Sequence, residues 1–109
     1  MNIALIGYGK MGKEIEKIAL KRNHTIVLKV DMDNKDTVTA ADFKKADVAI
    51  EFTTPHTVLG NIKKCFDADV PIVVGTTGWY ENFDQIKAEA LKGNKTLFYA
   101  TNYSLGVNL

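Results

Sequence analysis

MNIALIGYGKMG (residues 1–12) opens the chain and places a short apolar run directly before three glycines. This order predicts a buried strand, a tight turn and the start of a helix. In the pattern G-x-G-x-x-G, Gly7 permits the turn, Gly9 lets the backbone approach a pyrophosphate, and Gly12 lets helix and strand pack closely. The free N–H groups at the start of such a helix attract phosphate. Three glycines alone indicate a dinucleotide site only weakly, because glycine is also common in ordinary loops.

Apolar segments and helical patterns alternate along the rest of the chain. Five short segments rich in valine, isoleucine and phenylalanine are predicted to be strands: Asn2–Ile6, Thr25–Val30, Asp47–Phe52, Val70–Val74 and Thr96–Tyr99. Three apolar stripes at helical spacing predict helices between them: Met11, Ile15, Ile18, Ala19 and Arg22; Val58, Leu59, Ile62, Cys65 and Phe66; and Phe83, Ile86, Ala90 and Leu91. A shorter helix is predicted at Ala40–Ala46. Thr54-Pro55 is predicted to begin the helix of the second stripe, and Gly93-Asn94 to end that of the third.

The spacing of these elements predicts the fold class. Strands begin about every 20–25 residues, which is typical of βα units joined by helical crossovers. The sequence therefore predicts an α/β fold of the Rossmann type, a doubly wound, mostly parallel sheet of about five strands with helices on both faces. Ligands of such folds gather at the carboxyl ends of the strands. The candidate site is thus formed by the loops 7–12, 31–36, 52–56, 75–79 and 100–104.

The composition is that of an ordinary globular domain, with 109 residues of which 46% are apolar and 25% charged. A net charge of +1 predicts no strong attraction to nucleic acid or to an anionic membrane. Cys65 is the only cysteine, so an internal disulfide is excluded, and no apolar run is long enough to cross a membrane. We expect a cytoplasmic protein. No cluster of cysteine, histidine and aspartate has metal-ligand spacing, so no metal site is predicted.

An acidic residue follows the second predicted strand. Asp31 lies nineteen positions after Gly12, where a carboxylate can accept hydrogen bonds from the adenosine ribose of NAD. The alternative is a solvated carboxylate in an acidic turn. The next residue is Met32, so no arginine stands beside Asp31 to hold a 2′-phosphate, although Lys35 could reach one. NADH is therefore the preferred cofactor, and use of NADPH stays open.

Three further loops carry polar groups suited to the same ligand. Phe52 and Thr53 leave the third predicted strand where an adenine or ribose edge would lie. Glycines and hydroxyls after the fourth strand suit a polar ligand, and an amide with two hydroxyls after the fifth could orient a nicotinamide. Each loop alone is more often an ordinary turn, but together they predict one extended site. The candidate residues in the last two loops are Gly75, Thr76, Thr77, Ala100, Thr101, Asn102 and Tyr103.

These motifs resemble one family. GYGKMG, EFTTP, GTTGW and ATNYSLGVNL, in this order, are similar to 4-hydroxy-tetrahydrodipicolinate reductase, also called dihydrodipicolinate reductase, an enzyme of diaminopimelate and lysine biosynthesis. The resemblance runs from residue 1 to 109. It implies that Asp31 binds the adenosine ribose and that the loops at 75–77 and 100–103 contact the nicotinamide side. It also implies that the pyrophosphate is bound by Gly7, Tyr8, Gly9, Lys10, Met11 and Gly12.

The resemblance further implies a second domain. In this family the segment at 101–109 is a hinge that leads to a substrate-binding domain with a histidine pair and a catalytic lysine, and the full-length enzyme is a homotetramer. His24 and His56 match neither member of that pair, so residues 1–100 are expected to form the NAD(P)-binding domain and to contain no catalytic residue. We expect this chain to bind cofactor without turning over substrate. The alternatives are a stand-alone dinucleotide-sensing module and the N-terminal half of another amino-acid-pathway dehydrogenase.

Overall fold

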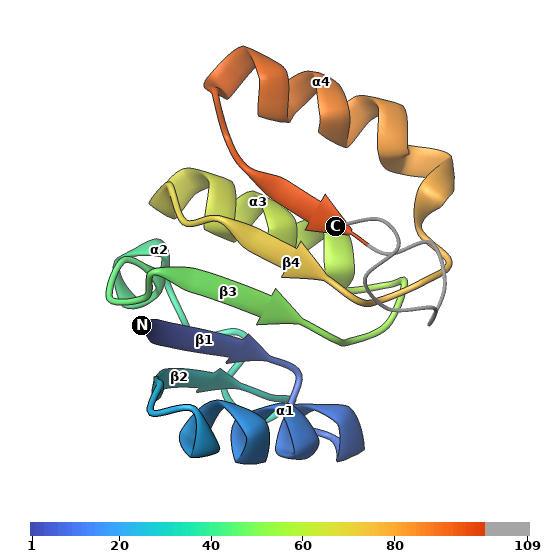
Figure 1. Cartoon of the computed structure of the whole chain (residues 1–109). Coiled ribbons are helices and arrows are strands. Elements are labelled where there is room, and N and C mark those ends of the chain that lie inside the picture. Colours follow the sequence, from blue (N-terminus) through green and yellow to red (C-terminus); the bar gives the residue numbers. More distant parts are fainter. Residues whose placement is uncertain (100–109) are drawn as a thin grey trace.

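A single parallel sheet organises the computed structural model, which describes residues 1–99. Its strand order is β2-β1-β3-β4-β5, so β1 and β3 are neighbours in the middle (Figure 1). This confirms the predicted Rossmann-type fold with five strands. The first two strands have the predicted bounds and the other three are shorter: β1 Asn2–Ile6, β2 Thr25–Val30, β3 Val48–Glu51, β4 Ile72–Val74 and β5 Leu97–Tyr99.

Helices cover both faces of the sheet, as predicted. Strand β2 lies on one side of β1, and from β2 the chain crosses over to β3 on the other side of β1. Because parallel crossovers are right-handed, α1 lies on one face and the later helices lie on the opposite face (Figure 1). Buried side chains form one core on each face of the sheet, and residues of β1 point to the two faces in turn. Ile3 packs with Ala19 of α1 on one face, and Ile6 packs with Ile62 of α3 on the other. The helices are α1 Lys10–Lys21, α2 Ala40–Phe43, α3 Val58–Ala68 and α4 Phe83–Gly93, with a 3₁₀ turn η1 at Tyr80–Asn82.

The carboxyl ends of all five strands lie at the same edge of the sheet. Ile6 pairs with Val30 on one side and with Glu51 on the other, Glu51 pairs with Val74, and Val74 pairs with Tyr99. In an open α/β sheet the ligand crevice lies at this edge, where neighbouring strands lead to helices on opposite faces. Here that point is between β1 and β3.

Two predictions about helices are wrong in part. In the predicted apolar stripe of α1, Met11 and Ile18 are 45% and 52% exposed, whereas Ile15 and Ala19 pack on the sheet. The helix packs on the sheet through a narrow line that contains Gly12 and Ala19. Helix α3 begins at Val58, three residues after Pro55. The intervening residues form a turn in which the N–H groups of Thr57 and Val58 both donate to the Thr54 carbonyl, at 3.1 Å.

One boundary differs from the prediction and one agrees with it. Helix α2 ends at Phe43, three residues before the predicted end. Helix α4 ends at Gly93-Asn94 as predicted: Gly93 is its last residue, and Asn94 is the left-handed C-cap with φ 54°. Asparagine tolerates this conformation better than most residues with a side chain.

An aromatic cluster lies beside β5, which contributes Tyr99. Trp79 is fully buried, and its ring centroid lies within 6.2 Å of those of Tyr80, Phe83 and Tyr99. Its indole Nε1 donates to the Thr76 carbonyl at 2.8 Å. Trp79 is therefore a packing anchor of this cluster. Within residues 1–99, no helix has the length and apolar character needed to cross a membrane.

Candidate functional site

The turn after β1 depends on two of its glycines for packing. Gly7 has φ 98°, a left-handed conformation that side chains disfavour, and its N–H donates to the Val30 carbonyl at 2.7 Å. A Cβ on Gly7 would overlap the carbonyl of Phe52, and a Cβ on Gly12 would overlap the carbonyl of Gly7. The first and third glycines therefore bring β1, β3 and α1 together.

The second glycine has a different environment. Among residues 1–99, a Cβ built on Gly9 would meet no atom within 4 Å, so its missing side chain leaves open space there rather than room for a packed neighbour. Gly9 is the N-cap of α1, and in the described structure no side chain caps this helix and no acidic residue lies in its first turn. The unpaired N–H groups and the positive end of the helix dipole therefore face the same open space. This arrangement suits an anion such as a pyrophosphate.

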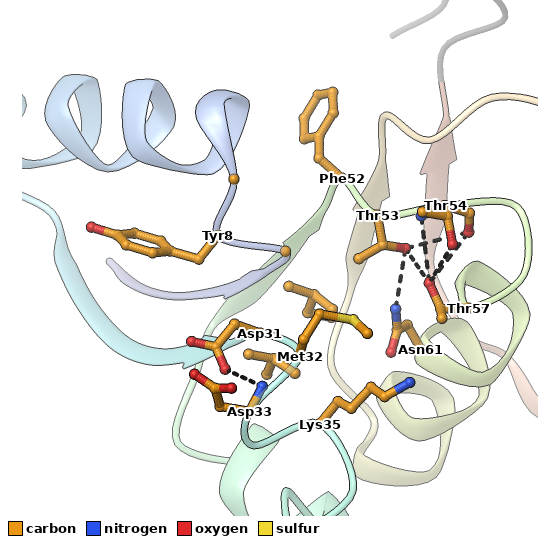
Figure 2. Close-up of a pocket in the computed structure, with 14 residues that line it drawn as sticks. Tyr8, Asp31, Met32, Asp33, Lys35, Phe52, Thr53, Thr54, Thr57 and Asn61 are labelled. Carbon is orange, nitrogen blue, oxygen red and sulfur yellow. Dashed lines mark hydrogen bonds between the residues drawn. The ribbon is translucent and has the colours of Figure 1, made fainter.

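Two cavities meet at this loop. The larger, about 470 Å³, extends from Gly7 over the end of β2 to α3 and is shown in Figure 2. The smaller, about 390 Å³, lies between the start of α1 and the loop after β4. Gly9, Phe52 and Thr53 line both cavities. A ligand that passes over Gly9 can therefore occupy both at once.

The carboxylate of Asp31 stands at the rim of the larger cavity. Its Oδ1 accepts the backbone N–H groups of Asp33 and Asn34, at 2.9 and 3.2 Å, and its own N–H donates to Asn34 Oδ1 at 2.8 Å. This local turn fixes the side chain. Within residues 1–99, no protein group bonds its second oxygen, Oδ2, which is thus available as an acceptor. Lys35 lines the same cavity.

The loop after β4 is built differently from the prediction. A Cβ on Gly75 would overlap the ring of Phe52, so this glycine makes room for a neighbouring side chain rather than for a ligand. The side chain of Thr76 is buried and turned inward, where its Oγ1 accepts the Thr53 N–H at 2.7 Å and donates to Glu51. Thr76 can therefore present its backbone, but not its hydroxyl, to the smaller cavity.

The side chain of Tyr8 is held away from the glycine loop. Its hydroxyl donates to Glu16 of α1, which also accepts the ammonium of Lys29 at 2.7 Å. That ammonium lies 4.7 Å from the centroid of the Tyr8 ring. The hydrogen bond to Glu16 raises the pKa of Tyr8, and the bond from Lys29 lowers the pKa of Glu16. The contacts of Glu16 and Lys29 with Tyr8 could not be predicted from the sequence, because charged residues on a helix and a strand are usually solvent-exposed.

All the predicted site residues in the described structure line one cavity or the other. The larger is lined by Gly7, Tyr8, Gly9, Asp31, Phe52 and Thr53, and the smaller by Gly9, Lys10, Met11, Gly12, Phe52, Thr53, Gly75, Thr76 and Thr77. The remaining predicted site residues lie outside the described residues: Ala100, Thr101, Asn102 and Tyr103.

The cysteine and the two histidines line neither cavity. Cys65 is fully buried on α3, and burial, with a smaller effect of the Glu51 charge, raises the pKa of its thiol to about 12. The ring Nδ1 of His24 lies 3.0 Å from the terminal amine of Met1, and His56 is exposed in the turn before α3. Within residues 1–99, no group of three or more histidine, cysteine, aspartate or glutamate side chains could hold a metal ion.

Comparisons with known proteins agree with one another. Residues 1–103 match the family model described as dihydrodipicolinate reductase, N-terminus. The 4-hydroxy-tetrahydrodipicolinate reductase of Christiangramia forsetii is 44% identical over 109 residues, which make up 100% of this chain and 45% of that protein. The protein of the same name from Staphylococcus epidermidis is 34% identical over 114 residues, covering 99% of this chain and 46% of its own length. The chain thus spans a little under half the length of these relatives.

Solved structures share the fold. A dihydrodipicolinate reductase from Paenisporosarcina sp. TG-14, with dipicolinate bound, matches with a TM-score of 0.75 at 23% identity, over 97% of this chain and 49% of that one. A probable dehydrogenase from Thermotoga maritima matches with a TM-score of 0.71 at 14% identity, over 92% of this chain and 36% of that one. At these identities the likeness shows the fold alone.

Proposed function

The chain belongs to the dihydrodipicolinate reductase family, and we propose that it is the nicotinamide-dinucleotide-binding domain of a 4-hydroxy-tetrahydrodipicolinate reductase. The observation that carries the proposal is the open space over Gly9. Two cavities meet there, beside an uncapped helix start, and a single Cβ would intrude on it. A dinucleotide has the matching shape, because two nucleosides are joined by a central anion.

The residues fit the parts of the cofactor in order. The larger cavity takes the adenosine, and Asp31 accepts the hydrogen bonds of its ribose through Oδ2. The N–H groups at the start of α1, at Lys10, Met11 and Gly12, bind the pyrophosphate. The smaller cavity, beside Thr76 and Thr77, takes the nicotinamide side. Residues 100–103, which lie outside the described residues, stay a proposed contact for the same end.

NADH is the proposed preference. The carboxylate of Asp31 would repel the 2′-phosphate of NADPH at short range. Lys35 lines the same cavity and carries a compensating charge, so NADPH remains a second ligand.

The reaction belongs to the longer protein. When bound, the nicotinamide supplies a hydride, which reduces the cyclic dicarboxylate substrate to tetrahydrodipicolinate. This chain holds and orients the dinucleotide, and substrate activation falls to the part of the relatives that it does not span. In this proposal residues 1–100 are the NAD(P)-binding domain and residues 101–109 the hinge. The complete enzyme is a cytoplasmic homotetramer, and the present chain binds cofactor without turnover.

Titration of the 109-residue chain with NADH, followed by reductase assay of the same sample, tests both parts. Saturable binding without substrate turnover is expected. Turnover by this chain alone would refute the division of labour, and a folded chain with no NADH binding would refute the proposed function. The family assignment removes the alternative of a different amino-acid-pathway dehydrogenase.

A further inference from the structure

A buried carboxylate stands behind the wall that the two cavities share. Glu51 ends β3, the strand beside β1 at the centre of the site edge, and is 0% exposed. Its hydrogen-bond partners in the described structure are all neutral. The hydroxyls of Thr53 and Thr76 donate to it, and Asn61 Nδ2 donates at 2.9 Å. These partners come from the end of β3, the loop after β4 and helix α3.

Further bonds extend this network into the walls of the site. The Thr53 N–H donates to Thr76 Oγ1 at 2.7 Å, and Thr57 Oγ1 donates to Thr53 Oγ1 at 2.8 Å, as part of the threonine cluster in Figure 2. The Gly75 N–H donates to the Glu51 carbonyl at 2.8 Å. Glu51 therefore fixes the loop after β3 against the loop after β4.

Phe52 lies between Glu51 and Thr53 in the sequence and is tightly confined. The Phe52 carbonyl lies against Gly7 and the Phe52 ring lies against Gly75, so closely that neither glycine has room for a Cβ. Phe52 and Thr53 line both cavities. Any shift of Thr53 or Thr76 would therefore move the wall between the cavities and change the distance that one ligand must span.

We propose that Glu51 is a positioning residue for the dinucleotide: through Thr53 and Thr76 it holds the shared wall so that one ligand can occupy both cavities. The inference rests on the proposed dinucleotide site. It needs no contact between Glu51 and the ligand, and Glu51 lines neither cavity.

The network requires a group that only accepts hydrogen bonds. Three donors converge on the Glu51 side chain: Thr76 on Oε1, and Thr53 and Asn61 on Oε2. In Glu51→Gln one of these oxygens becomes an NH₂ group, which must face at least one of the donors. Thr76→Val removes the hydroxyl that links Thr53 to Glu51 and keeps the shape of the side chain. Thr76→Ser keeps the hydroxyl and is compared directly with Thr76→Val.

The test compares a ligand that spans both cavities with one that fills only the larger. NADH and adenosine 5′-monophosphate are titrated into the full chain and the three variants. For Glu51→Gln and Thr76→Val we expect the Kd of NADH to rise about tenfold, which corresponds to one hydrogen bond between NADH and the displaced wall. The Kd of the monophosphate should stay within about twofold. Thr76→Ser should bind NADH more tightly than Thr76→Val, because it keeps the hydroxyl that donates to Glu51.

Each outcome bears on the inference. An equal loss for NADH and the monophosphate would mean that Glu51 serves only the general fold, and an unchanged Kd for NADH would mean that it does not position the wall. Either result overturns the inference. If Glu51→Gln does not fold, the comparison of Thr76→Val with Thr76→Ser decides alone. Failure of the wild-type chain to bind NADH would instead overturn the proposed function beneath it.

Discussion

Replacing Gly9 by alanine should fill the space that the dinucleotide needs without disturbing the fold. The Gly9 backbone has φ −85° and ψ −153°, an extended conformation that alanine also adopts. Its new methyl group meets no atom of residues 1–99 within 4 Å. It would project instead into the junction of the two cavities, beside the uncapped start of α1.

The expected loss of affinity follows from what the methyl group displaces. A pyrophosphate pushed away from the start of α1 loses one hydrogen bond between a charged oxygen and a backbone N–H, worth about 1.5–3 kcal/mol. The Kd of NADH should therefore rise about 10- to 150-fold. The free energy of unfolding should fall by no more than about 1 kcal/mol, because alanine is a poorer N-cap than glycine but restricts the unfolded chain more.

Isothermal titration with NADH and unfolding in urea measure the two effects separately. Gly60→Ala is the matched control, since Gly60 is exposed in α3, also has open space at its Cβ position, and lines neither cavity. It should raise stability by about 0.5–1 kcal/mol and leave the Kd of NADH unchanged. A folded Gly9→Ala variant that binds NADH as tightly as wild type would refute the reasoning.

Three other substitutions test separate parts of the account. Gly7→Ala should lower the free energy of unfolding by about 2–4 kcal/mol, because its backbone is left-handed and its Cβ would overlap Phe52; an unchanged urea midpoint would contradict this. Asp31→Asn should raise the Kd of NADH about tenfold, because a neutral acceptor replaces a charged one, and should lower the Kd of NADPH. Both cofactors are titrated into this variant, and a change of the two Kd values in the same direction would contradict the account. Cys65 keeps its proton in the folded state up to a pKa of about 12, whereas the unfolded thiol ionises near 9.0. Its contribution to stability is therefore fully present below pH 9 and lost as pH rises toward 12, by up to about 1.4 kcal/mol per pH unit, so wild type should lose more stability over this range than Cys65→Ala. Identical pH profiles for these two proteins would show that the thiol is not desolvated.

The fold could be predicted from the sequence because its strands are short, apolar and regularly spaced. β1 and β2 have the predicted bounds, since glycine or charged residues stop them sharply. The exposure of Met11 and Ile18 on α1 could not be predicted. Met11 and Ile18 are apolar, but the helix rests on the sheet along a narrow line where Gly12 approaches closely, and this depends on contacts between distant segments.

The residues around the two cavities could be predicted from the sequence, but not the contacts that support them. The glycine pattern and the strand ends are local features of the chain, and the loops that they indicate line the two cavities. Gly75 lines the smaller cavity, but the packing of its backbone against the ring of Phe52, which lies on another strand end, could not be predicted. Glu51 was not predicted at all. A signal was present, since an acidic residue in an apolar strand, followed closely by several threonines, indicates a buried acceptor with its donors nearby.

The central claim is that this chain holds a nicotinamide dinucleotide over Gly9. Calorimetric titration of the 109-residue chain with NADH tests it most directly. The account predicts saturation at one NADH per chain, weakened in Gly9→Ala and unchanged in Gly60→Ala. A chain that is folded by circular dichroism and shows no saturable heat of binding would contradict it.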